Sequence, residues 1–123
     1  MNKIIVTGGL GYIGSHTAVE LSEKFQVVIV DDLSNSSIEV LDGISKISHS
    51  KPIFEKLDLK IKKDVKKLFD RHNDAIGLIH FAAFKAVGES VKKPLNYYEN
   101  NLISLIYILQ EIDNRNLLFN LIF

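Results

Sequence analysis

The sequence predicts an α/β protein built on a doubly wound parallel sheet, and two observations carry that prediction. Five apolar runs alternate with segments of helical periodicity along the chain. Three of these runs, at Lys3–Thr7, Gln26–Asp31 and Ala75–Ala82, are rich in Ile and Val without polar alternation, which is typical of strands buried on both faces. Strands and helices that alternate on this scale indicate βαβ units with right-handed crossovers.

The remaining elements follow from the same patterns. Two further strands are expected at Ile53–Leu57 and Leu117–Phe123, and the second of these has the composition of a buried strand. Apolar residues at helical spacing predict helices over Tyr12–Lys24, Ile38–His49, Ile61–His72 and Leu95–Asn114. Pro94 precedes the last helix, where proline suits the first turn. A chain of 123 residues is sufficient for one domain with one core, so we assign residues 1–123 to a single domain.

Charge argues against a nucleic-acid partner. Fifteen basic residues balance fifteen acidic ones, so no global field favours nucleic acid or an anionic membrane. The stretch "KLDLKIKKDVKK" is locally basic, but its lysines are interleaved with core positions. We interpret it as the solvated face of a helix, with a nucleic-acid patch as the alternative.

Cysteine content and hydropathy indicate the cellular compartment that we expect. The chain has no cysteine, which excludes disulfides and thiolate metal sites and is compatible with a cytoplasmic protein. No apolar run approaches the ~20 residues of a spanning helix, and no signal peptide fits the amino terminus. We expect no membrane partner and no metal.

A glycine-rich loop follows the first strand and opens the first helix. The stretch "TGGLGYIGSH" satisfies G-x-x-G-x-x-G with Gly8, Gly11 and Gly14. Glycine allows a tight turn, a close approach to a pyrophosphate and close packing of helix on strand. Free N–H groups at the helix start, helped by the helix dipole, then face the phosphates. The motif in this context predicts a dinucleotide site of the Rossmann fold, with a ligand-free tight turn as the alternative.

Acidic residues at strand ends indicate which dinucleotide is bound. Asp31 and Asp32 end the second strand, and a carboxylate there accepts both hydroxyls of an adenosine ribose and repels the extra phosphate of NADP. The predicted cofactor is therefore NAD. One of the two aspartates is expected to serve only a turn. Asp58, after the third strand, faces the adenine or caps a turn before Ile61.

These motifs, together with the stretch "IHFAAFKAVGESVKKPLNYYENN", resemble the UDP-glucose 4-epimerase family of the extended short-chain dehydrogenases/reductases. The resemblance runs from Lys3 to the last residue, and "FKAVGESVKKPLNYYENN" is its most specific part. It implies a doubly wound NAD-binding sheet followed by a smaller domain for a UDP-sugar substrate. A sister nucleotide-sugar dehydratase or decarboxylase is the weaker alternative.

The resemblance also implies the residues of the cofactor site. Tyr12 and Ile13 are expected under the pyrophosphate, Asp31 on the ribose, and Asp58 with Leu59 beside the adenine. Further contacts are expected from the loop after the second strand, the segment after the fourth strand and the start of the last helix: Asp32, Leu33, Ser34, Asn35, Ser36, Phe81, Ala82, Ala83, Phe84, Lys85 and Asn100. Without the resemblance, Lys85 has the character of an exposed loop lysine, and His80 that of a satisfied core histidine.

The residues of proton transfer are not found in the sequence. The family reaction uses a tyrosine and a lysine four residues apart, with a serine nearby. Four residues after the tyrosines at 12, 97, 98 and 107 stand His16, Asn101, Leu102 and Glu111. We therefore expect an N-terminal portion of an epimerase, truncated after the fifth strand and inactive alone. A self-contained NAD-binding module is the alternative.

The last helix has two apolar faces. Leucine, isoleucine and tyrosine cover most of its circumference between Leu95 and Ile112, whereas a helix outside a sheet needs one apolar face. A second copy of the chain, giving a homodimer through residues 95–114, would cover the other face. Downstream chain is the alternative cover.

Overall fold

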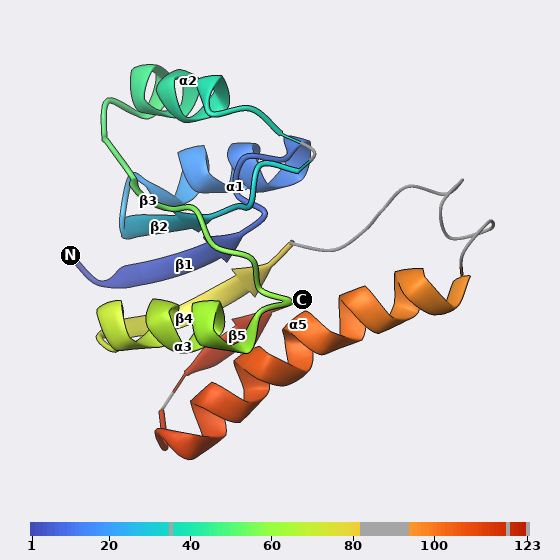
Figure 1. Cartoon of the computed structure of the whole chain (residues 1–123). Coiled ribbons are helices and arrows are strands. Elements are labelled where there is room, and N and C mark those ends of the chain that lie inside the picture. The colour runs from blue at the N-terminus through green and yellow to red at the C-terminus, as the bar shows by residue number, and fades with distance from the viewer. Residues whose placement is uncertain (35, 82–93, 118, 123) are drawn as a thin grey trace.

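In the computed structural model, the chain forms a five-stranded sheet in the order β3-β2-β1-β4-β5 (Figure 1). The structure describes residues 1–34, 36–81, 94–117 and 119–122. The strands are β1 (Lys3–Thr7), β2 (Gln26–Val30), β3 (Ile53–Glu55), β4 (Ala75–His80) and β5 (Asn120–Ile122). Each neighbouring pair is parallel. The chain runs outward from β1 first to one side and then to the other, which confirms the doubly wound prediction.

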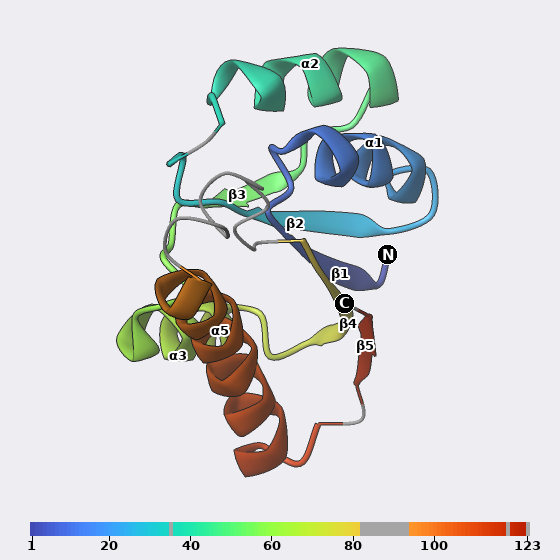
Figure 2. The same cartoon turned by 90° about the vertical axis from the view of Figure 1, so that its right-hand side faces the viewer.

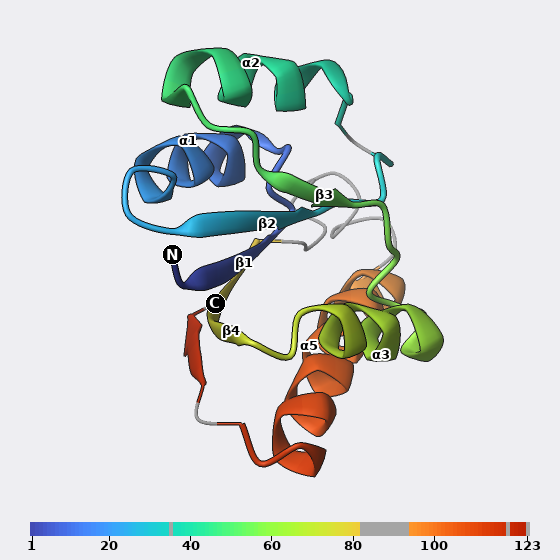
Figure 3. The ribbon, with the colours of Figure 1, turned by 90° about the vertical axis from the view of Figure 1, so that its left-hand side faces the viewer.

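The helices lie in two layers, one on each face of the sheet (Figure 2). They are α1 (Tyr12–Leu21), α2 (Glu39–Ser48), α3 (Lys62–Arg71) and α5 (Pro94–Asn114). Helices α1 and α2 share one face, and α3 and α5 share the other (Figure 3). None of the helices in the described part of the chain has the length and hydropathy of a membrane span.

Two boundaries differ by three residues from the sequence prediction, each for a local reason, and the other boundaries that the structure describes agree within two residues. Helix α1 ends at Leu21 rather than Lys24, because the N–H groups of Lys24 and Phe25 both donate to the Leu21 carbonyl and close the helix in a turn. Strand β5 begins at Asn120 rather than Leu117. There Asn116 takes a left-handed φ of 51° and the Leu117 N–H donates to Ile112 O, a helix-ending geometry that delays the strand.

Two hydrophobic clusters explain why the strands lack polar alternation. Val6 and Ile29 pack under α1 and α2, while Ile5 and Val28 pack under α3 and α5. Successive residues of a strand point to opposite faces, so both faces of β1 and β2 require apolar side chains. The basic stretch around α3 is confirmed as a solvated helix face, since the four lysines of α3 are exposed and Val65, Leu68 and Phe69 are buried.

The carboxyl-terminal run corrects one expectation. Leu117, Phe119 and Leu121 pack partly against the cluster under α3 and α5, but Asn120 and Ile122 are exposed. Strand β5 is therefore an edge strand with one open face, not a buried strand. Helix α5 also leaves a stripe uncovered by the described residues: Leu95, Leu102, Ile106 and Leu109.

Candidate functional site

The residues singled out in the sequence gather at one edge of the sheet, where its parallel strands end. Backbone hydrogen bonds join these strand ends. Gly8 N donates to Val30 O at 2.7 Å, Asp31 N to Glu55 O at 3.2 Å, and Phe81 N to Thr7 O at 3.0 Å. Strand β1 lies between β2 and β4, so the chain departs to opposite faces on its two sides. In open α/β sheets, this switch point at the carboxyl edge is where ligands bind.

The glycine loop folds tightly back on itself. Gly8 has a left-handed φ of 65°, and its carbonyl accepts the N–H of Gly11 at 3.0 Å. A Cβ on Gly14 would stand 2.3 Å from Gly8 O, and a Cβ on Gly9 would stand 2.7 Å from a methyl carbon of Ile29. Side chains at positions 9 and 14 would therefore push the loop off the sheet.

The loop leaves the start of α1 open. The first hydrogen bond of the helix runs from Ser15 N to Gly11 O at 2.8 Å, so the N–H groups of Tyr12, Ile13 and Gly14 have no acceptor within the helix. Gly11 supplies no side-chain cap, and the first turn carries no acidic residue. The positive end of the helix dipole is thus not compensated by a side chain of α1, and this is the arrangement that binds phosphate groups.

Asp31 stands at the exit of β2 and is held by uncharged donors. Its Oδ2 accepts Leu10 N at 3.2 Å, and its Oδ1 accepts Leu33 N at 2.9 Å and the Ser36 hydroxyl at 2.8 Å. Among the described residues, no Lys, Arg or His forms an ion pair with this carboxylate. The carboxylate is therefore fixed in orientation while its negative charge stays free for a ligand.

Asp32 has a different role from Asp31. Its Oδ1 accepts both the N–H and the hydroxyl of Ser34, at 3.0 and 2.7 Å, which is an aspartate turn. Leu33 between them takes a left-handed φ of 65°. Asp31 makes the same turn contact to Leu33 N, but it also holds Leu10 N and Ser36, so that Asp32 serves only a turn stays a prediction.

Asp58 also serves a turn in this structure. Its Oδ1 accepts Lys60 N at 2.9 Å, and its carbonyl accepts Ile61 N at 3.0 Å. Leu59 beside it is buried. This turn uses only Oδ1 of Asp58. A contact from Oδ2 to an adenine at the carboxyl edge of the sheet is therefore compatible with it.

The other predicted site residues are only partly described. Phe81 follows β4 and packs against the cluster under α1 and α2. Asn35, Ala82, Ala83, Phe84 and Lys85 lie outside the described residues, and of Asn100 only the place in the first turns of α5 is described. Their contacts stay predictions.

Sequence reasoning missed one contributor to this edge, Leu10, and the partners of another, His80. Leu10 was not singled out, yet its backbone N–H fixes Asp31, and no side-chain pattern signals a backbone donor. His80 was expected to be a satisfied core residue, and it is bonded to Thr7 and Ser104, although its ring is only half-buried.

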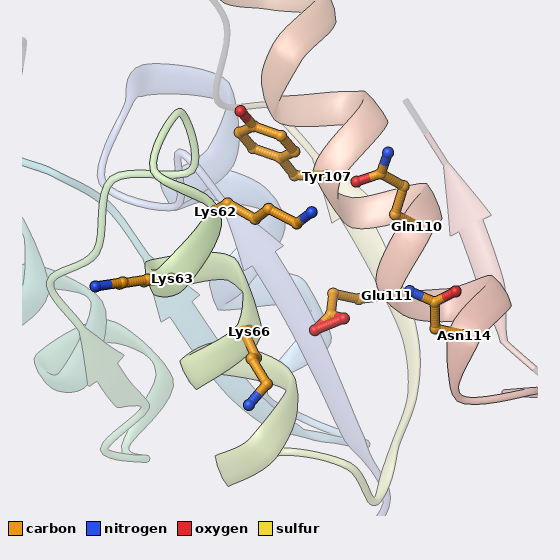
Figure 4. A pocket seen from close by; sticks show the side chains of 7 residues that line it. All are labelled: Lys62, Lys63, Lys66, Tyr107, Gln110, Glu111 and Asn114. Atoms are coloured by element: carbon orange, nitrogen blue, oxygen red, sulfur yellow. The ribbon is translucent and has the colours of Figure 1, made fainter.

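A separate hollow of about 470 Å³ lies between α3 and α5 (Figure 4). Its walls are Lys62, Lys63, Lys66, Tyr107, Gln110, Glu111 and Asn114. Lysines line one side and polar residues of α5 the other. None of these residues belongs to the glycine loop or to the strand exits, so the hollow is distinct from the carboxyl-edge site.

Comparison with known sequences identifies relatives over nearly the whole chain. A UDP-glucose 4-epimerase of Schizosaccharomyces pombe is 46% identical over 121 residues, which cover 95% of this chain and 34% of that protein. A UDP-glucose 4-epimerase of Yersinia enterocolitica is 47% identical over 112 residues, with 89% and 33% covered. The chain thus spans about a third of the length of these relatives.

Solved structures give the same picture. A UDP-glucose 4-epimerase of Bifidobacterium longum in complex with NAD+ and UDP matches with a TM-score of 0.88 and 36% identity, over 94% of this chain and 35% of that one. One from Stenotrophomonas maltophila, with NAD and a formylated UDP-arabinopyranose, matches with a TM-score of 0.86 and 38% identity, over 95% and 35%. The family model described as GDP-mannose 4,6 dehydratase matches residues 5–121. The relatives described above are all UDP-glucose 4-epimerases. By the match to the family model, this chain belongs to the GDP-mannose 4,6-dehydratase family.

Proposed function

We propose that this chain is the NAD-binding part of a UDP-glucose 4-epimerase, an isomerase that interconverts UDP-glucose and UDP-galactose. The observation that carries the proposal is the pairing of two features at the carboxyl edge. One is an uncapped helix start with free N–H groups, and the other is a carboxylate held only by uncharged donors. The first suits a pyrophosphate and the second suits a ribose diol.

The residues present fit NAD better than NADP. An ionised carboxylate offers about four acceptor positions, and three protein donors occupy Asp31. A ribose hydroxyl would take the free position on Oδ2, and a second could replace the Ser36 hydroxyl on Oδ1. A 2′-phosphate in the same place would meet the carboxylate charge, which no described cation offsets.

The remaining contacts are proposed by position. Gly8, Gly11, Tyr12, Ile13 and Gly14 would border the pyrophosphate. The exits of the next strands would surround the adenosine and the nicotinamide side: Asp32, Leu33, Ser34, Asn35, Ser36, Asp58, Leu59, Phe81, Ala82, Ala83, Phe84, Lys85 and Asn100. Exposure of Tyr12 and Ile13, at 82% and 54%, supports a role beside a ligand rather than in the core.

The chemistry that NAD supplies when bound is a reversible hydride transfer at carbon 4 of the sugar. What this chain contributes is binding and orientation of the dinucleotide. Proton transfer needs a tyrosine activated by a lysine, and we propose that this pair and the UDP-sugar contacts are supplied by sequence other than residues 1–123. The 123-residue chain alone should therefore bind NAD without turnover.

Two measurements on the purified chain test the proposal. Calorimetry should show NAD binding, with NADP weaker by at least about tenfold because of the carboxylate charge. An assay for interconversion of UDP-glucose and UDP-galactose should show none. Equal affinity for both dinucleotides would refute the assignment of Asp31 to the ribose. Measured turnover would refute the proposal that proton transfer needs residues other than 1–123.

Two other functions remain as candidates. The family takes its description from a GDP-mannose 4,6-dehydratase, so a nucleotide-sugar dehydratase is the alternative enzyme, although the epimerase relatives share 46–47% identity with this chain. A self-contained NAD-binding module is the non-enzymatic alternative. Assays of the gene's full product with UDP-glucose and GDP-mannose distinguish the three outcomes.

We also propose a homodimer through residues 95–114, in the cytoplasm. The support is the exposed apolar stripe on α5, with Leu102, Ile106 and Leu109 at 55%, 47% and 45% exposure. A second α5 would cover such a stripe. Sedimentation should show a dimer that Ile106→Glu dissociates, while Lys67→Glu on the exposed face of α3 leaves it intact. A monomeric wild-type chain would contradict the proposal.

A further inference from the structure

Three side chains from three elements form a polar chain beneath the site. The Thr7 hydroxyl, at the end of β1, lies 2.7 Å from Nδ1 of His80, at the end of β4. Nε2 of the same ring lies 3.4 Å from the Ser104 hydroxyl of α5. Thr7 is fully buried and Ser104 is 2% exposed. One imidazole thus joins Thr7, which lies 73 positions before it, to Ser104, which lies 24 positions after it.

The proton positions follow from the last member of the chain. The Ser104 hydroxyl lies 3.2 Å from the carbonyl of Asn101, which can only accept, so we assign its one proton to that contact and an acceptor role towards His80. Nε2 then carries the ring proton and donates it to Ser104. Nδ1 of a neutral ring has no proton and accepts the Thr7 hydroxyl. With these proton positions, a neutral ring satisfies both its contact to Thr7 and its contact to Ser104.

The two ends of this chain lie at two separate parts of the candidate site. Thr7 directly precedes Gly8 in the glycine loop, and its carbonyl accepts Phe81 N at 3.0 Å. Asn101 follows Asn100, the proposed cofactor contact in the first turns of α5. Buried polar groups with long-range partners impose a specific geometry, because the cost of leaving any of them unsatisfied is high.

We infer that His80, as the neutral Nε2–H tautomer, is a positioning residue that sets the start of α5 relative to the glycine loop. The inference rests on the proposed function, since the two segments it aligns are the proposed dinucleotide contacts. The role we assign to His80 is to join these two segments, not to contact the ligand. It fixes the distance between two parts of the chain that must hold one dinucleotide together.

The first test is the tautomer in the ligand-free chain. Nitrogen-15 NMR of the histidine rings in the full 123-residue chain at neutral pH should show His80 with Nδ1 unprotonated and Nε2 protonated, assigned against His80→Gln. The opposite tautomer, or a charged ring, would overturn the assignment. This readout needs no cofactor, so it stands even if the chain does not bind NAD.

The second test is communication from Ser104 to the glycine loop. Ser104→Ala should shift the backbone amide resonances of Gly8 and Gly9 and weaken NAD binding by about threefold to tenfold, the range of one neutral hydrogen bond. Ser45→Ala is the matched control, because the Ser45 hydroxyl also donates to a helix carbonyl, at 3.0 Å, but belongs to no such chain. Equal shifts for the two variants would overturn the inference.

A double-mutant cycle separates positioning from simple packing. An asparagine amide at position 80 reaches the place of Nδ1, and a glutamine amide reaches the place of Nε2. His80→Asn loses the Ser104 contact, so adding Ser104→Ala should change the amide shifts and the NAD affinity no further, whereas the same addition to His80→Gln should. Additive effects in the Asn background would overturn the chain of contacts.

The outcomes also distinguish this inference from the proposed function. If the wild-type chain binds NAD and Ser104→Ala binds it equally well, the positioning role is wrong and the proposed function stands. If the wild-type chain does not bind NAD, the proposed function fails, and the amide shifts and tautomer still decide whether the His80 chain exists.

Discussion

Two carboxylates at neighbouring strand ends have opposite surroundings. Asp31 follows β2 and Glu55 ends β3, and the backbone of one donates to the backbone of the other at 3.2 Å. Asp31 is held by two backbone N–H groups and a hydroxyl. Glu55 faces Arg71 at 2.6 Å and the buried His72 at 3.5 Å. The two carboxylates, although they lie at the ends of neighbouring strands, thus have different partners: uncharged donors for Asp31 and a guanidinium for Glu55.

The face of the sheet explains the difference. Alternate residues of a strand point to opposite faces, so Asp31 shares the side of Val27 and Ile29 under α1, while Glu55 shares the side of Ile53 under α3. The start of α1 offers N–H groups, and the end of α3 offers the guanidinium of Arg71. Among the described residues, Asp31 therefore has no cationic partner, as its proposed role at a ribose requires, whereas Glu55 connects α3 to the sheet.

The largest effect is expected from a change that displaces the glycine loop and, with it, the donor Leu10 N of Asp31. Gly14→Ala places a methyl group 2.3 Å from Gly8 O, so the loop must move and carry Leu10 N away from Asp31. We expect complete loss of NAD binding by calorimetry and a decrease of about 1–3 kcal/mol in the free energy of unfolding.

Gly43 is the matched control for this change. A Cβ on Gly43, inside α2, meets nothing within 4 Å. Gly43→Ala should therefore stabilise the protein by about 0.5–1 kcal/mol through the lower backbone entropy of alanine, without effect on NAD. Retained NAD binding in Gly14→Ala would show that the loop geometry does not govern the site.

The next effect isolates the charge of Asp31. Asp31→Asn keeps the shape but gives a neutral acceptor and an added donor that faces other donors. We expect NAD affinity to fall about tenfold to one hundredfold, as for hydrogen bonds to a charged group, and the preference for NAD over NADP to disappear. Asp32→Asn, which touches only Ser34 among the described residues, should alter both by less than about threefold. Equal losses in the two variants would contradict the division between them.

Glu55→Gln tests the opposite half of the comparison. Loss of this charge leaves Arg71 and His72 without their carboxylate, so urea denaturation should show a loss of about 1–2 kcal/mol, less than for a fully buried pair because Arg71 is half exposed. NAD affinity should not change. Glu23→Gln, at an exposed position, is the control. A drop in NAD affinity would mean that the two strand ends are not independent.

The sequence was sufficient for the sheet because the evidence for each strand is local. Continuous apolar runs such as Gln26–Asp31 predict strands that are buried on both faces. The glycine motif predicts a tight turn followed by the start of a helix. Asp31 was also predictable, since its position relative to the loop is set by the strand order. These inferences need only the periods of helix and strand.

The partners of Glu55 and of His80 were not predictable. Glu55 meets Arg71 and His72 only because α3 crosses the sheet at one particular angle and register. His80 contacts Ser104, 24 residues later in the chain, and this spacing does not predict a contact. Long-range side-chain geometry depends on packing, which single-sequence patterns do not encode.

The smallest effect concerns Asp70, a carboxylate that is paired with a cation at a half-exposed position. A hydrogen bond from Arg115 holds the pKa of Asp70 below its ordinary value of 3.8, and this pair joins α3 to the residue that follows α5. A depressed pKa in the folded state contributes stability above pH 3.8, and this contribution is lost as the pH falls through the lower folded value. Asp70→Asn should therefore be slightly less stable than wild type at pH 7, and the difference should disappear as the pH falls below the folded pKa of Asp70. The difference should shrink in 1 M salt, because the side chain is 53% exposed. Asp42→Asn on the exposed face of α2 is the control for thermal unfolding across this pH range. If Asp70→Asn proved as destabilising as Glu55→Gln, then the cation alone, and not the burial of Glu55, would set the strength of such a fastening.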